Sequence, residues 1–197
     1  MNSRLVRLFG YFGILAPIVG FSVIFLSIRT APWFSWTGNA LSDLGVEGFT
    51  AVIFNDGLTM TAAVMMAFAI GLYELTKEDR IGRIGFRFYI AASIFLLGIG
   101  FFPETTGDVH YYFSVAFFLA LPLSLLFFAF YMFRNGMRSL GLLSAVLGAV
   151  AALVWVPSWG AVAIPEALSA LAAGTWSAVL GAWMTRMEGE EDKFSIN

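Results

Sequence analysis

The sequence contains no cysteine and a single histidine, His110, and both shortages limit its chemistry. Without cysteine the chain has no disulfide, no thiolate metal site and no cysteine nucleophile. With one histidine, a zinc site would need mostly carboxylate ligands, which is uncommon, so we predict no metal site. The G-x-S-x-G, H-E-x-x-H, phosphate-loop and dinucleotide-binding motifs are also missing. No motif therefore specifies a reaction or a cofactor.

Charged residues are scarce as well. They make up 12% of the 197 residues, against roughly 25% in typical soluble domains, while hydrophobic residues make up 59%. The formal net charge is −2 and no basic block occurs, so a nucleic-acid partner is not expected. A soluble fold of this length could not bury so much apolar surface. We therefore expect the chain to lie in a lipid bilayer.

Six apolar stretches, separated by polar or Gly/Pro segments, each approach the length that a membrane helix needs. Because unpaired backbone groups are costly in hydrocarbon, the stretches are predicted to be α-helices. The predicted fold class is all-α, a polytopic membrane protein with a bundle of about six transmembrane helices. The stretches lie near Leu8–Ile28, Ala51–Leu72, Gly85–Phe102, His110–Phe133, Leu140–Trp155 and Pro165–Thr185.

The basic residues predict the orientation. Of the 11 lysines and arginines, all except Arg29 fall on one side of a six-span arrangement. The positive-inside rule places that side, with both termini, in the cytoplasm, and we expect a multi-pass protein of the cell membrane. Residues 1–186 would form the transmembrane domain, and 187–197 an acidic, disordered cytoplasmic tail.

The first outer segment reads W33-F-S-W-T-G-N-A-L-S-D-L-G45. Asn39, Ser42 and Asp43 have i, i+3, i+4 spacing, so they would share one face of a helical turn. This pattern predicts a short interfacial or re-entrant helix, ended by Gly45 in a left-handed conformation. In the alternative interpretation, Asn39 or Ser42 only caps a helix and Asp43 stabilises its first turn.

Further polar residues surround the same predicted side. An ionised Asp56 would be costly against lipid, so it either extends to the membrane interface or faces the bundle, and we favour the bundle. His110 lies near Glu104 and Asp108, where it could assist acid–base chemistry, ligate a metal or serve as a structural hydrogen-bond partner. Glu166 follows Pro165 and is interpreted as ordinary helix-start chemistry. The candidate catalytic residues are Asp43 and His110, and the candidate substrate-binding residues are Asn39, Ser42, Asn55, Asp56, Glu104 and Asp108.

Small residues recur every four positions in the last apolar stretch, at Ser169, Ala173, Ser177 and Gly181. Such a stripe lets helix backbones approach closely, where dispersion forces drive association in lipid. We interpret the stripe as a helix-packing face.

The segment N39-A-L-S-D-L-G45, the following Asn55, and F102-P-E with the later His110 resemble the DUF998 family of prokaryotic six-helix membrane proteins. That family is similar in topology to the DRAM-like membrane proteins. The resemblance covers most of the chain and implies the six-helix fold. It points to Ser42, Asp43, Glu104 and His110 as a site, but it implies no reaction.

Three functions are compatible with these features. The first is a lipid-active protein whose outward-facing polar pocket binds, or acts on, a lipid or isoprenoid from the outer leaflet. The second is a non-enzymatic scaffold or assembly protein, and the third is a small-solute channel or exporter. The third ranks last because the helix centres offer mainly Ser and Thr. The expected partners are the bilayer and a lipid ligand; the sequence specifies no oligomeric state, cofactor or catalytic activity.

Overall fold

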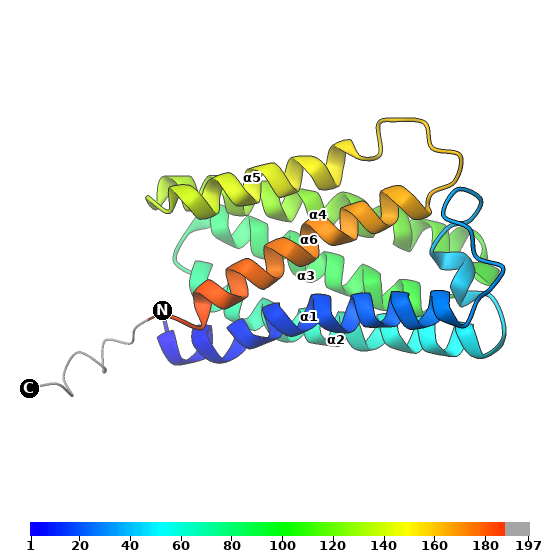
Figure 1. Ribbon diagram of the computed structural model, residues 1–197. Coiled ribbons are helices and arrows are strands. Elements are labelled where there is room, and N and C mark those ends of the chain that lie inside the picture. The colour runs from blue at the N-terminus through cyan, green and yellow to red at the C-terminus, as the bar shows by residue number, and fades with distance from the viewer. Residues whose placement is uncertain (188–197) are drawn as a thin grey trace, which may run out of the picture.

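The computed structural model describes residues 1–187, and in this range the chain is helical (Figure 1). Two short 3₁₀ turns, η1 (Ser42–Gly45) and η2 (Glu104–Thr106), interrupt the connections. The helices are α1 (Ser3–Arg29), α2 (Gly48–Thr76), α3 (Arg80–Phe101), α4 (Asp108–Arg134), α5 (Arg138–Leu153) and α6 (Ala163–Met184).

Five of these helices are long and apolar enough to cross a membrane, and α5 is the exception. With 16 residues, α5 extends only about 24 Å at a rise of 1.5 Å per residue, less than the ~30 Å hydrocarbon core. The predicted all-α membrane fold is confirmed. The predicted acidic tail falls mostly on residues 188–197, which lie outside the described residues.

Local chemistry explains where several helices begin. The Asn2 side chain accepts a hydrogen bond from the Leu5 amide at the start of α1. Asp79 accepts from two free amides at the start of α3. Helix α2 begins at Gly48, whose φ of 68° suits a residue without Cβ.

The predicted left-handed conformation of Gly45 is wrong, whereas the predicted short helix that ends at Gly45 is present as the 3₁₀ turn η1. Gly45 ends the 3₁₀ turn η1 and has no positive φ; Gly48 provides that conformation instead. Gly45 is needed for another reason, because a Cβ there would collide with the Asn55 side chain. The close approach of this turn to α2 therefore excludes a larger residue.

Consecutive helices run antiparallel and pack side by side, and α6 returns to pack on α1 (Figure 1). The bundle thus has two ends. The basic end carries the start of α1, the end of α6 and the α2–α3 and α4–α5 connections. The carboxylate end carries the connections at residues 30–47, 102–107 and 154–162. Residues 30–47 are called the cover segment below.

Four buried aromatic side chains form a layer across the bundle interior. Trp176 on α6 lies 5.1–6.3 Å, between ring centroids, from the other three rings. Its indole Nε1 donates to the Ser144 hydroxyl at 2.8 Å, so the polar atom is satisfied. This aromatic layer consists of Phe68, Tyr89, Phe128 and Trp176.

On the basic side of this layer, α1 and α6 meet through glycine. A Cβ added at Gly181 would lie 2.5 Å from the backbone oxygen of Gly10, so neither position has room for a side chain. One turn away, the Ser177 hydroxyl donates to the Gly13 carbonyl at 2.8 Å. Gly181 and Ser177 therefore serve as the packing face that the sequence predicts.

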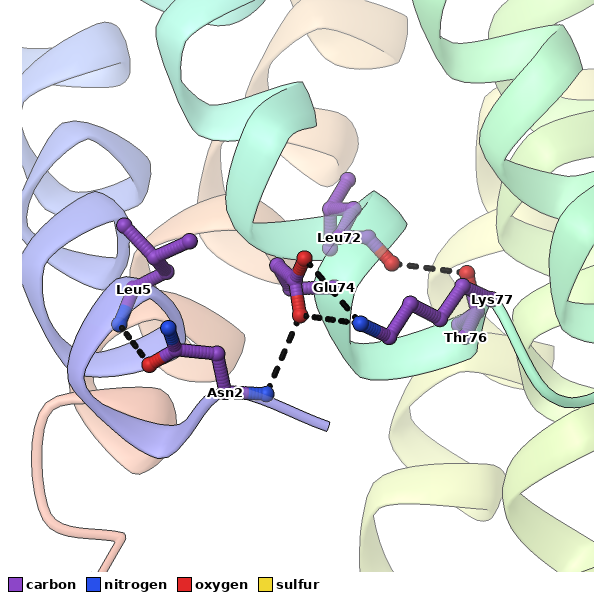
Figure 2. A network of polar contacts seen from close by, with 6 residues as sticks. All are labelled: Asn2, Leu5, Leu72, Glu74, Thr76 and Lys77. Carbon is purple, nitrogen blue, oxygen red and sulfur yellow. Dashed lines mark hydrogen bonds and ion pairs between the residues drawn. The ribbon is translucent and has the colours of Figure 1, made fainter.

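At the basic end, Glu74 is paired with Lys77 and ties α1 to α2 (Figure 2). The Glu74 carboxylate accepts from the backbone amide of Asn2 at 3.0 Å, and the Lys77 ammonium lies 3.0 Å from the same oxygen. Thr76 donates back to the Leu72 carbonyl. Each Glu74 oxygen thus has a hydrogen-bond donor.

Candidate functional site

A cavity of about 130 Å³ lies inside the bundle, between the aromatic layer and the carboxylate end. Its α6 wall runs from Glu166 to Ser177, which is about 16 Å at helical rise and roughly half of the hydrocarbon thickness. The walls are mainly apolar and come from α1, α2, α3, α4 and α6. They include Phe21, Ile24, Phe54, Leu58, Met65, Leu96, Phe117 and Leu121.

Glu166 lies at the carboxylate end of this cavity. It occupies the first turn of α6, lines the cavity and is only 8% exposed. One carboxylate oxygen accepts the backbone amide of Leu41 at 2.6 Å, across 125 residues of sequence. The same stretch of the cover segment is held by a second bond, from the Ala163 amide to the Asn39 carbonyl. The start of α6 therefore positions the cover segment over the cavity.

Asp43 organises the cover segment from within. One of its oxygens accepts from the Asn39 side-chain amide at 2.7 Å and from the Ala40 backbone amide at 3.0 Å. The Asn39 side chain in turn accepts from the Ser35 amide. Asp43 thus closes a local loop, and η1, which contains it, contacts η2.

Glu104 on η2 joins the cluster from the other side. Its carboxyl interacts with the Ser42 hydroxyl, with Asp43 and, electrostatically, with His110. Burial raises the pKa of Glu104 above its usual range; the hydrogen bond from Ser42 opposes this rise and the nearby Asp43 carboxylate adds to it. The Glu104 Oε2 atom is buried and has no hydrogen-bond partner among residues 1–187.

His110 lies in the first turn of α4 and is 6% exposed. Its Nδ1 is 2.8 Å from the carbonyl oxygen of Phe102. Because a carbonyl only accepts, Nδ1 must carry the proton, and in the neutral ring Nε2 is then an acceptor. Nε2 is buried and unpaired within the described part of the chain.

The predicted site residues separate into two groups. Asn55 donates to the Gly45 carbonyl at 2.9 Å and so anchors the cover segment to α2. Asp56, predicted to face the bundle, is instead exposed on the outside of α2, since the helix turns it away from Asn55. Asp108 is also exposed. The structure brings together Asn39, Ser42, Asp43, Asn55, Glu104 and His110, and leaves Asp56 and Asp108 apart.

The predicted pairing of Asp43 with His110 as acid and base stays a prediction. Among residues 1–187 the two side chains share no hydrogen bond, and Glu104 interacts with both. No group of three or more His, Asp or Glu side chains in this range could hold a metal ion. The unpaired Glu104 Oε2 and His110 Nε2 can form hydrogen bonds with a polar ligand.

The site residue missing from the sequence-based prediction is Glu166. A glutamate directly after a proline is common at a helix start, so the position of Glu166 does not by itself predict that the side chain is buried. The periodicity of α6 contains the missing signal. Glu166 lies on the same helical face as Ser169, Ala173 and Ser177, so the small-residue stripe predicts an inward-facing carboxylate.

The comparisons with known proteins identify a family and specify no chemistry. Neither the curated proteins nor the solved structures that were compared match this chain. A family model described as "Protein of unknown function (DUF998)" matches residues 14–183, which include all six helices in whole or in part and the whole cluster at the carboxylate end. The chain is therefore a membrane protein that belongs to the DUF998 family.

Proposed function

We propose that this protein binds an amphiphile, a lipid or isoprenoid, with an apolar chain in the cavity and a polar head group at the carboxylate end. The observation that carries the proposal is the cavity itself. Its apolar walls end at the Glu166 carboxyl and at Ser42, and the unpaired Glu104 Oε2 and His110 Nε2 lie at the same end of the bundle. Buried polar groups without hydrogen-bond partners destabilise the fold, and a ligand head group would supply those partners.

Access from the bilayer is supported by a groove between α1 and α6. The groove lies on the outer surface and includes Ile18 and Phe25, both exposed. Pro17 and Phe21 line both the groove and the cavity. The Phe21 ring lies over Gly174, where an added Cβ would be 3.0 Å from it. An amphiphile would enter sideways here when Phe21 moves.

The proposed orientation places the carboxylate end outside and both termini in the cytoplasm, following the positive-inside rule. Because the chain has no cysteine, single Thr37→Cys and Glu78→Cys variants report on the two ends. A membrane-impermeant maleimide applied to intact cells should label Thr37→Cys and spare Glu78→Cys. The opposite labelling would place the site in the inner leaflet.

Native mass spectrometry of the protein, released from mild detergent, tests the proposed binding. Ala173→Phe places a ring into the cavity, whose volume is close to that of an engineered apolar cavity that binds benzene. Leu171→Phe is the matched control, because Leu171 is 51% exposed on the outside of α6. Wild type and Leu171→Phe should retain a bound amphiphile that Ala173→Phe lacks.

The other two functions give different results in the same experiment. Identical lipid complements in three folded proteins would contradict the proposal and favour a scaffold. A channel would need a continuous polar path, whereas the aromatic layer lies across the bundle interior below the cavity. Solute flux through reconstituted wild type, reduced by Ala173→Phe, would favour the channel.

A further inference from the structure

Two of the buried side-chain atoms left unpaired among residues 1–187, Glu104 Oε2 and His110 Nε2, belong to the cluster around η2, and both can accept. The other two, Ser27 Oγ and Trp155 Nε1, are not part of this cluster and can donate. Glu166 lines the cavity and uses one oxygen for the Leu41 amide. The Nε2 of the neutral imidazole accepts a hydrogen bond, and so does each carboxyl oxygen in the ionised form. A ligand that completes the His110 Nε2 and the ionised carboxylates must therefore donate.

His110 lies on the helical face of α4 that lines the cavity farther along the helix. Ser114, Phe117 and Leu121 line the cavity, and they follow His110 at i+4, i+7 and i+11 on one helical face. His110 is thus one turn before Ser114, the first residue of α4 that lines the cavity. Its bond to Phe102 fixes Nδ1, which leaves Nε2 as the free atom.

The charges nearby have one sign. Asp43, Glu104 and Glu166 gather at this end, and electrostatic interactions connect them. No lysine or arginine occurs in residues 30–76, 88–133 or 139–185. Arg29, in the last turn of α1, is exposed. A phosphate or carboxylate head group would meet like charge here without a cation to offset it.

From this chemistry we infer that the head group is a non-anionic hydrogen-bond donor, an alcohol or an amine, on an apolar chain. The inference rests on the proposed amphiphile binding and specifies its ligand class. A hydroxyl or ammonium group can donate to Glu104, to Glu166 and to the His110 Nε2. Phospholipid phosphates and fatty-acid carboxylates are excluded as head groups at this position.

A matched set of ligands tests the inference. The purified protein is titrated with a 12-carbon alcohol, the amine and the phosphate monoester of the same chain, and bound ligand is measured by native mass spectrometry. The alcohol or the amine should bind at least about tenfold more tightly than the phosphate, since like-charge contact costs several kcal/mol. Glu104→Gln and Glu166→Gln should each reduce this ratio, and Glu74→Gln at the basic end should not.

The two Gln variants keep the shape of the site. A glutamine at 166 retains an acceptor for the Leu41 amide, so the cover segment stays in place. If all three ligands bind equally, or the phosphate binds best, and Ala173→Phe still blocks them, the head-group inference is wrong and amphiphile binding stands. If no ligand distinguishes wild type from Ala173→Phe, the proposed function itself fails.

Discussion

The two ends of the bundle differ in how their carboxylates are paired and in how closely their helices pack. At the basic end Glu74 meets Lys77 and the Asn2 amide, and α1 touches α6 through Gly10 and Gly181. At the carboxylate end acidic groups meet one another, and the helices stand apart around a cavity. Buried, incompletely bonded acids reduce stability. The contacts at the basic end therefore stabilise the fold. The carboxylate end retains destabilising polar groups, which are typical of binding sites.

The largest expected effect on stability comes from a substitution in the α1–α6 helix contact near the basic end. Gly181→Ala should lower the free energy of unfolding by about 1–3 kcal/mol, because its Cβ would overlap the backbone oxygen of Gly10. Gly174→Ala, on the cavity side, meets the side chains of Phe21 and Pro17 and should cost less than about 1 kcal/mol. Thermal unfolding in one detergent compares them. Equal losses would mean that the two halves pack alike.

Removal of one carboxylate at each end comes next. Glu166→Ala leaves the buried Leu41 amide without an acceptor, which should cost about 1–3 kcal/mol. Hydrogen exchange at residues 39–45 should also become faster, since this bond holds the cover segment. Glu74→Ala should have a much smaller effect, because water replaces its bonds. Unchanged exchange in Glu166→Ala would show that other contacts hold the segment.

The proposed access route predicts a kinetic difference on α1. Phe21→Ala should release a bound amphiphile severalfold faster than wild type, because the ring separates the groove from the cavity. Phe25→Ala is the control, since Phe25 lines the groove and not the cavity. Release is followed by exchange into empty nanodiscs. Equal rates in both variants would remove the α1–α6 groove as the route.

The smallest effect concerns pH. The pKa of Glu104 is raised on folding, so the folded chain holds this proton more tightly than the unfolded chain. Its contribution to stability is therefore present below the unfolded value of about 4.5 and is lost as pH rises through the folded pKa. The melting temperature should fall slightly over this window, in which Asp43, His110 and Glu166 are the neighbouring titratable groups. Glu104→Gln should reduce the slope of melting temperature against pH over this window. A slope identical to that of wild type would contradict the raised pKa of Glu104.

Hydropathy predicts the helices because the bilayer imposes length and composition on each span separately. The polar cluster is also largely predictable, since Asn39, Ser42 and Asp43 are close in sequence. The bond between Glu166 and Leu41 is not, because it joins segments 125 residues apart. Asp56 was misplaced because the cost of a charge in lipid does not fix which way a residue near a helix end turns.

The account depends on an amphiphile occupying the cavity with its head group at Glu166. A cryo-electron microscopy map of the protein in native-lipid nanodiscs, made visible by a bound antibody fragment, tests this directly. We predict elongated density between Tyr89 and Glu166, with its polar end within hydrogen-bond distance of the Glu166 and Glu104 carboxyl groups. An empty cavity in a well-resolved map, or a head group located toward the aromatic layer, would contradict the account.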